Sequence, residues 1–144
     1  MKPPLAKLFY TEIVVPEDVI DLNQHVNNVV YVQWMQDVAI GHSRSTGATQ
    51  AAREAGGTWV ARSHHIEYHQ PAFVGDRLRL MTWIHDFRKI RSLRKYKFLR
   101  LDDNITIATG RTEWVFVDAA SGRPRSIPPT VIDCFDLLPE AEEP

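Results

Sequence analysis

The chain has 144 residues, of which 44% are hydrophobic and 24% are charged, and its formal net charge is −1. This length accommodates one domain with a substantial core and excludes two ordinary domains. The balanced composition excludes a disordered or low-complexity protein, and the slightly negative charge argues against general nucleic-acid binding. The single cysteine, Cys134, excludes an intrachain disulfide and a cysteine-based metal cluster, and it fits a reducing compartment.

The N-terminal stretch Met1-Lys2-Pro3-Pro4 lacks the apolar run of a secretory signal peptide. No stretch of the sequence approaches the apolar length that crosses a membrane. We therefore expect a soluble, cytoplasmic protein with no membrane partner.

The first elements in chain order are a strand and a long helix. Residues 8–15 are rich in aromatic and β-branched side chains, which predicts a strand. From Asn28 onward, the pattern indicates an amphipathic helix. Its buried face repeats at spacings of four, three and four residues through Tyr31, Met35, Val38 and His42. The helix should end near Gly47, because glycine favours the left-handed conformation that ends helices, and a second short helix is expected over residues 48–55.

The second half of the chain is typical of a sheet. Four segments are rich in β-forming residues and are separated by turn signals, namely residues 58–68, 76–86, 92–101 and 105–118. Long strands joined by short connections predict an antiparallel meander. With the first strand they form a curved antiparallel sheet of about five strands wrapped around the one long helix, an α+β fold. The tail should add a short helix over residues 130–138 and end in solvated glutamates.

The densest polar stretch lies between the first strand and the long helix, and it reads Asp21-Leu22-Asn23-Gln24-His25-Val26-Asn27-Asn28. Asn27 or Asn28 is suited to cap the helix by accepting hydrogen bonds from its first N–H groups. A carboxylate, an imidazole and a helix N-terminus therefore meet in one region. Such an arrangement favours chemistry on a carbonyl, because amides at a helix start stabilise developing negative charge. The alternative is a purely structural turn and cap, the usual role of loops rich in Asp and Asn.

The order of strand, polar motif, helix and four strands resembles the hotdog-fold thioesterases of the 4-hydroxybenzoyl-CoA thioesterase type, over nearly the whole chain. The motif from Asp21 to Asn28 is similar almost letter for letter to a stretch of the plant acyl-ACP thioesterases, which contain two hotdog units where this chain has one. Weaker similarities are Ile66-Glu67-Tyr68, Pro71, Gly75-Asp76 and Gly122-Arg123. The resemblance implies a single hotdog domain over residues 1–144 that hydrolyses an acyl thioester to a free acid and a thiol.

The resemblance also implies catalytic roles within the motif. Asp21 occupies the position of the carboxylate that attacks the thioester or activates water in single-domain members. Asn23 and His25 match the corresponding residues of the plant enzymes. Those enzymes place a Glu-Cys pair where this chain has Pro71-Ala72, and this departure removes a cysteine-nucleophile mechanism.

The helix start is the expected position of the substrate carbonyl, which backbone N–H groups would polarise. The substrate-binding residues expected there are Asn27, Asn28, Val29 and Tyr31. Gln24 stands where many bacterial single-domain members have glycine, and this difference favours fatty acyl groups as substrates.

A second cluster of charge lies in residues 88–97, which contain six cations: Arg88, Lys89, Arg91, Arg94, Lys95 and Lys97. CoA carries phosphates and acyl carrier protein has an acidic face, so either substrate would be attracted, with binding expected at Arg88, Lys89, Arg91 and Lys95. The alternative is a solvated edge strand whose cations prevent pairing with other sheets. A nucleic-acid interface is a poorer interpretation, because Tyr96 and Phe98 share one strand face and suit a core.

No metal or cofactor is expected. His64, His65 and His69 are close in sequence, but neighbours in a strand point to opposite faces, and no Cys or carboxylate triad accompanies them. His42 lies on the apolar side of the helix and suits a buried, hydrogen-bonded packing residue.

The resemblance implies partners and leaves two other functions open. Members of the family pair their sheets into a homodimer, and a homotetramer is a further option, with the sites between subunits and residues 58–68 as the candidate lining from the second subunit. The substrate is expected to be an acyl-CoA or an acyl carrier protein thioester. The alternatives are a hotdog hydratase or dehydratase, whose usual motif spaces its acid and histidine differently from Asp21 and His25, and a non-catalytic acyl-binding protein.

Overall fold

The computed structural model describes residues 7–144, so the stretch on which the signal-peptide expectation rests lies outside the described residues. The strands are β1 (Leu8–Val14), β2 (Gly57–Tyr68), β3 (Arg77–Phe87), β4 (Arg91–Arg100) and β5 (Ile105–Asp118). The helices are α1 (Asn28–Thr46), α2 (Ala48–Glu54) and α3 (Pro129–Ile132), with single 3-10 turns at Glu17–Val19 and Glu140–Glu142. No helix in this part of the chain is long and apolar enough to cross a membrane.

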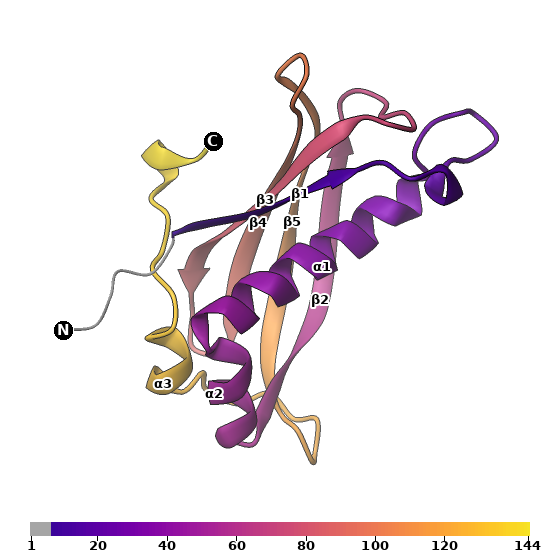
Figure 1. Cartoon of the computed structure of the whole chain (residues 1–144). Helices are drawn as coiled ribbons and strands as arrows, with labels where there is room; N and C mark the ends of the chain where they lie inside the picture. The colour runs from indigo at the N-terminus through magenta and orange to yellow at the C-terminus, as the bar shows by residue number, and fades with distance from the viewer. Residues whose placement is uncertain (1–6) are drawn as a thin grey trace.

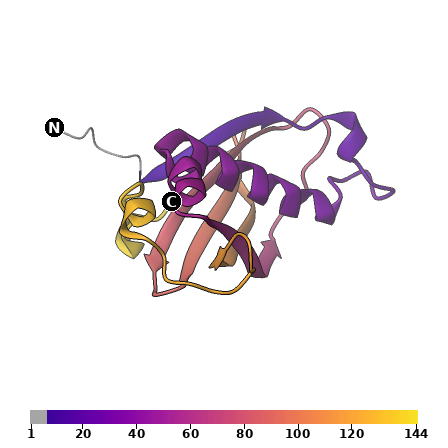
Figure 2. The same ribbon diagram turned by 90° about the horizontal axis from the view of Figure 1, so that it is seen from below.

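The five strands form one antiparallel sheet in the order β1-β3-β4-β5-β2. The sheet curves around one side of α1 (Figures 1 and 2), which confirms the predicted α+β hotdog architecture. The predicted meander is confirmed for β3, β4 and β5 but is wrong for β2, which pairs with β5 at the far edge of the sheet. The connection over residues 69–76 explains the difference, because it is tied by hydrogen bonds to the β1 side of the molecule instead of closing a hairpin.

The core lies between α1 and the concave face of the sheet. The predicted buried stripe of α1 is confirmed, since Tyr31, Met35, Val38 and His42 are all buried. Tyr31, Met35 and Val38 share one contiguous apolar cluster with sheet residues that include Leu80 and Phe98, whereas His42 packs against Phe9 and Phe135. Gly47 ends α1 with a φ of 85°, which is the left-handed conformation expected of a terminating glycine.

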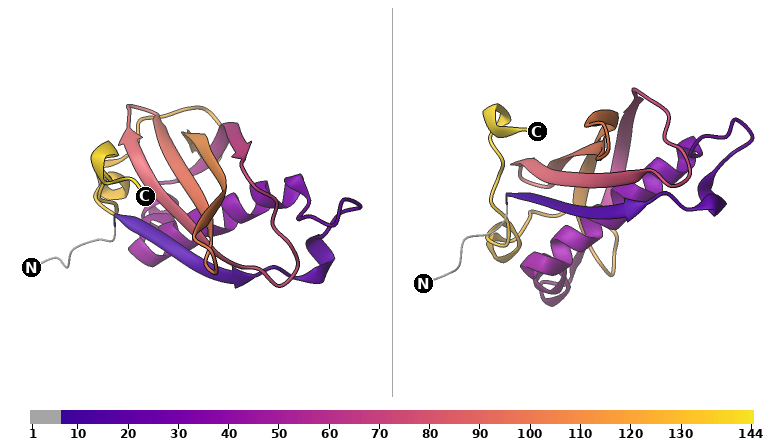
Figure 3. Two further views of the ribbon diagram at one scale, coloured as in Figure 1. Left: turned by 90° about the horizontal axis from the view of Figure 1, so that it is seen from above. Right: turned by 45° about the horizontal axis from the view of Figure 1, so that its top comes forward.

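The C-terminal segment differs from the prediction. The helix expected over residues 130–138 is only the four-residue α3, after which the chain runs in an extended form along the sheet (Figure 3). Leu138 packs on Met81 and Trp83, and its N–H donates to the carbonyl of Ile84 at 3.2 Å. Burial of these apolar groups on the outer face of the sheet accounts for the extended path. The end of the chain is also less solvated than expected, because Glu143 forms an ion pair with Lys95 at 2.8 Å.

Candidate active site

A small hairpin carries the predicted reactive carboxylate between β1 and α1. Ile20 and Val26 form an isolated antiparallel bridge, and the N–H of Asp21 donates to the carbonyl of His25 at 2.8 Å. The N–H of Gln24 closes the turn onto the carbonyl of Asp21 at 3.0 Å. Inside the turn, the backbone N–H of Asn23 donates to the Asp21 carboxylate at 2.9 Å. Asn23 therefore holds the carboxylate through its backbone, and its side chain is exposed.

Gln24 has a φ of 66°, which lies in the left-handed region. Side chains with a Cβ adopt this conformation at a cost of roughly 1–2 kcal/mol, whereas glycine adopts it freely. The geometry gives a physical reason for the glycine that the resemblance implies at this position in bacterial single-domain members. The chain instead tolerates local strain next to its candidate reactive group.

The start of α1 is joined directly to this hairpin. The N–H of Asn27 donates to the carbonyl of Val19 at 2.9 Å, and the Asn27 side chain accepts from the N–H of Val29 at 3.0 Å. Asn27 is thus the capping residue, and Asn28 is the first residue of the helix. The Tyr68 hydroxyl at the end of β2 donates to the carbonyl of Asn28 at 3.0 Å. The hairpin, the helix start and the end of β2 therefore form one connected region.

The loop before β3 completes this region. The N–H of Val26 donates to the carbonyl of Ala72 at 2.9 Å, and the ring of His25 packs edge-on against Phe73 with centroids 5.3 Å apart. Pro71-Ala72 thus supports the hairpin through a backbone carbonyl.

Tyr31, which was expected to contact substrate, lies beneath the helix start rather than on its surface. Its ring packs against Tyr68, Trp34 and Phe98. Burial, with a smaller contribution from Tyr68, raises the pKa of Tyr31 to about 12, so its phenol stays neutral at ordinary pH. Tyr31 therefore fixes the position of the helix start from within the core.

A cavity of about 790 Å³ lies between α1, α2 and the first half of β2. No residue of the Asp21 hairpin or of the first turn of α1 lines it, so the cavity and the hairpin are separate within one chain. Arg94 of β4 lines the cavity and is only 4% exposed. The sequence analysis did not single out Arg94, because it treated the cations of residues 88–97 as one group. The alternation of the strand could have identified Arg94 as buried, since it shares its face with the buried Tyr96 and Phe98.

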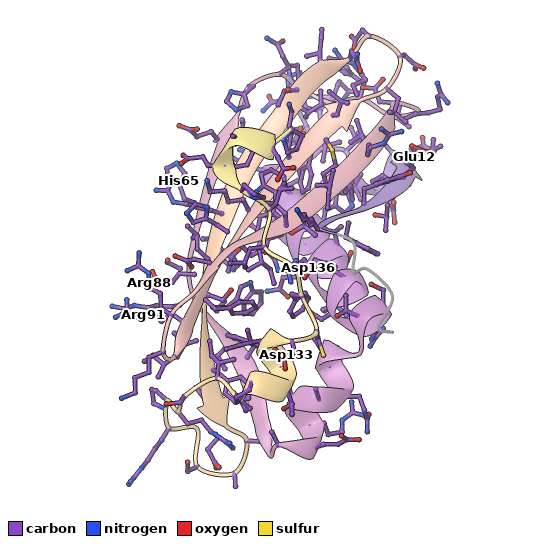
Figure 4. All side chains as sticks on the ribbon, turned by 90° about the vertical axis from the view of Figure 1, so that its left-hand side faces the viewer. Glu12, His65, Arg88, Arg91, Asp133 and Asp136 are labelled. Atoms are coloured by element: carbon purple, nitrogen blue, oxygen red, sulfur yellow. The ribbon has the colours of Figure 1, made fainter. Side chains whose placement is uncertain are left out.

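The cationic stretch does not form one uniform surface. β4 lies between β3 and β5, so the edge-strand alternative is wrong. Arg91 is paired with Glu113 at 2.7 Å, and Lys95 with Glu143 at 2.8 Å. Arg88, paired with Asp86 at 3.2 Å, extends outward beside Arg91 at the β3–β4 turn (Figure 4). The net attraction for an anionic ligand is therefore weaker than the sequence count implied.

A family model described as the thioesterase-like superfamily matches residues 14–135, which is most of the chain. The chain belongs to this superfamily. The match agrees with the enzyme class that the motif predicted, a thioester hydrolase. No curated protein matches the sequence.

Solved structures share the fold at low sequence identity. YbaW, a probable thioesterase from Escherichia coli, superposes with a TM-score of 0.81 at 17% identity, over 88% of this chain and 95% of that one. A 1,4-dihydroxy-2-naphthoyl-CoA thioesterase from Synechocystis gives 0.79 at 18% identity, over 88% and 94% of the two chains. The 12:0-ACP thioesterase from Umbellularia californica gives 0.82 at 14% identity, over 92% of this chain and 52% of that one, so this chain spans about half its length.

Replacement of Gln24 by glycine is expected to stabilise the protein, because it removes the left-handed strain at the hairpin. The gain should be about 1 kcal/mol in the free energy of unfolding, since the greater flexibility of glycine in the unfolded chain offsets part of the strain relief. Chemical denaturation measures the difference. Leu22→Gly is the matched control in the same turn, where φ is not positive, and it should leave stability equal or lower. A destabilised Gln24→Gly protein would contradict the strain argument.

Asn27 and Asn28 offer a second matched pair. Asn27→Ala removes the oxygen that caps the Val29 N–H and should lower the free energy of unfolding by about 1 kcal/mol. Asn28→Ala should change it by no more than a few tenths of a kcal/mol, because this exposed side chain is not the helix cap and the effects of surface substitutions are usually small. Thermal and urea unfolding of both variants compare them directly. Equal losses in the two variants would show that Asn27 is not the cap.

Proposed function

We propose that this protein hydrolyses an acyl thioester, with Asp21 as the reacting carboxylate and the N-terminus of α1 as the group that polarises the thioester carbonyl. The observation that carries the proposal is the direct hydrogen bonding of the Asp21 hairpin to the residues that start α1. The superfamily of the chain supports the reaction class.

Asp21 is suited to either of two routes. One carboxylate oxygen accepts from the Asn23 N–H, while no residue in 7–144 donates to the other oxygen, which is left to act. In the first route this oxygen adds to the carbonyl carbon and expels the thiolate, giving an acyl anhydride that water then cleaves. In the second route the carboxylate takes a proton from a water molecule that adds to the carbonyl, and the thiolate leaves. Both routes end in a free acid and a thiol.

The helix start supplies the stabilising donors. Asn28 and Val29 are exposed, Val29 to 73%, so a substrate carbonyl has access to this end of α1. The Val29 N–H is already held by Asn27, which makes the Asn28 N–H the leading donor to the developing oxyanion. The alignment of the helix dipoles adds partial positive charge at the same end. Asn23 then acts by orienting Asp21, and His25, fixed against Phe73, contacts the substrate near the thioester.

We further propose that the working unit is a dimer paired through β2. This strand has twelve residues, and all but Gly57, Trp59 and Ile66 are exposed. It pairs with β5 on one side only, so its other edge presents free backbone groups that favour pairing with a second chain.

Such pairing brings the two separated parts of the site together. The Asp21 hairpin lies at the Tyr68 end of β2, whereas residues 57–61 at its other end line the cavity, about 30 Å away along the strand. Figure 1 shows the start of α1 and the α2 region at opposite ends of the molecule. When two β2 strands pair antiparallel about a two-fold axis, the Tyr68 end of each chain meets the Gly57 end of the other. Each site then combines Asp21 of one chain with the cavity of its partner.

The leaving group is CoA or the phosphopantetheine arm of acyl carrier protein. Fold neighbours act on both classes, 1,4-dihydroxy-2-naphthoyl-CoA in one case and 12:0-ACP in another. Lys89 at the exposed β3–β4 turn has no ion-pair partner within residues 7–144 and is available to a phosphate, together with Arg88. Arg91 and Lys95 contribute by exchanging their internal glutamate partners for the ligand.

The first test is Asp21→Asn, which keeps the size of the side chain and removes the carboxylate. Thiol release from acyl-CoAs should fall by about 10²–10⁴-fold while the melting temperature stays within a few degrees. Asp18→Asn is the matched control, since Asp18 is exposed in the preceding 3-10 turn. Activity of Asp21→Asn within a few-fold of the wild type would refute the role of Asp21. Loss of enoyl absorbance without thiol release would instead indicate a hydratase, and binding without either change would indicate an acyl-binding protein.

The second test asks whether one site uses two chains. Ser43 lines the cavity from α1, so Ser43→Trp should block it and abolish activity without removing Asp21. When Ser43→Trp and Asp21→Asn are co-expressed, mixed dimers contain one intact site, and activity should recover to about a quarter of the wild type. Analytical ultracentrifugation confirms the dimer. No recovery in verified mixed dimers would show that each site lies within one chain, and full activity of Ser43→Trp alone would show that the cavity is not used.

A further inference from the structure

Arg94 is a buried cation, and the hydrogen-bond partners of its guanidinium within residues 7–144 are a histidine and a threonine. Its Nη1 lies 2.9 Å from Nδ1 of His42 and donates to the Thr82 hydroxyl at 3.1 Å. The ring of Phe135 lies on one side of the guanidinium, with its centroid 5.7 Å away. Burial lowers the pKa of Arg94 to about 10, which still leaves it charged at neutral pH. Arg94 is therefore removed from water although no carboxylate of residues 7–144 forms an ion pair with it.

The donors of Arg94 are only partly used. A guanidinium has five N–H groups in a planar fork, and the contacts to His42 and Thr82 both involve Nη1. The N–H groups on Nε and Nη2 have no acceptor among residues 7–144. This free edge of the fork matches the geometry that binds a carboxylate through two parallel hydrogen bonds.

The charged side chains that line the cavity beside Arg94 are all positive. Its lining includes Arg44 and Arg53 as well as Arg94 but contains no aspartate or glutamate. Much of the remaining wall is apolar, from Ala39, Ala52, Ile84, Phe87, Trp114 and Phe135. An apolar wall favours a hydrocarbon chain, while a buried guanidinium in the same wall favours an anion at a defined depth.

We propose that the acyl group of the substrate ends in a carboxylate and that Arg94 binds this terminal carboxylate inside the cavity. This inference rests on the proposed thioester hydrolysis, because the cavity is taken to hold the acyl group whose thioester meets Asp21. The substrate class is thus the monothioesters of dicarboxylic acids. The terminal carboxylate supplies the counter-charge that residues 7–144 do not give Arg94, and the methylene chain contacts the apolar wall.

The experiment compares two series of acyl-CoAs that differ only at the far end, one ending in a methyl group and one ending in a carboxylate, each over increasing chain length. Wild-type protein should hydrolyse the carboxylate series with a kcat/KM at least about tenfold higher at one favoured length, because charge-assisted bidentate hydrogen bonds are strong in a desolvated site. The preference should appear mainly in KM, since the terminal carboxylate is bound equally before and during the reaction.

Substitutions at Arg94 locate the source of the preference. Arg94→Met should remove the preference for the carboxylate series while retaining hydrolysis of the methyl series. Arg94→Lys should keep a reduced preference, because a lysine retains the charge but not the planar fork. Arg123→Met, an exposed arginine at a turn, should behave as the wild type. Circular dichroism and the melting temperature report whether each variant is folded.

The possible results separate the two proposals. Faster hydrolysis of the methyl series by wild-type protein at every length would overturn the role of Arg94 and leave thioester hydrolysis intact. An Arg94→Met protein with an equal loss on both series would assign Arg94 to structure alone. Should Arg94→Met fail to fold, the wild-type comparison and Arg94→Lys still decide the question. No thiol release from either series by wild-type protein would overturn the proposed function itself.

Discussion

The packing of α1 into the curved sheet is the constraint on which the rest of the molecule depends. The helix buries a stripe from Tyr31 to His42, most of it against the concave face of the sheet, with Phe135 of the C-terminal segment against His42. This burial supplies much of the hydrophobic stabilisation, and it also fixes both ends of a helix about 28 Å long. The N-terminal end is held beside the Asp21 hairpin, and the C-terminal end is held above Arg94. One packing interaction therefore sets the positions of both candidate functional regions.

The Asp21 region is built mainly from backbone hydrogen bonds. The bonds Asp21 to His25, Val26 to Ala72 and Asn27 to Val19 are all formed between main-chain groups at 2.8–2.9 Å. Backbone hydrogen bonds of this kind fix the loop without using the side chains, which remain available to contact substrate. The surrounding hydrogen bonds hold Gln24 in the left-handed conformation against the preference of a residue with a Cβ for negative φ.

The sequence predicted the bounds of the long helix well, because helix caps and the periodicity of buried residues depend on neighbouring residues. The cap at Asn27, the terminating Gly47 and the buried stripe of α1 gave the bounds of the long helix almost to the residue. The place of β2 beside β5 was not predictable in this way, because strand order depends on contacts between distant segments. The cavity was missed for the same reason, since it is formed by α1, α2 and β2 together. The alternation of buried and exposed residues in β4 indicates that Arg94 is buried, but the sequence interpretation grouped it with the neighbouring surface cations.

Asp21 and Arg94 lie near opposite ends of α1, and this separation prevents an ion pair between them. A reactive carboxylate in contact with a buried guanidinium would form an ion pair, which would hold the carboxylate as a structural group and reduce its nucleophilicity. Separation leaves both groups without an oppositely charged partner among residues 7–144, since Asp21 is held by a backbone N–H and Arg94 by His42 and Thr82. Pairing through β2 would then bring the carboxylate of one chain to the mouth of the cavity that contains the arginine of the other. The remaining distance would be filled by the acyl chain, so that a substrate is selected by the length between its thioester and its far end.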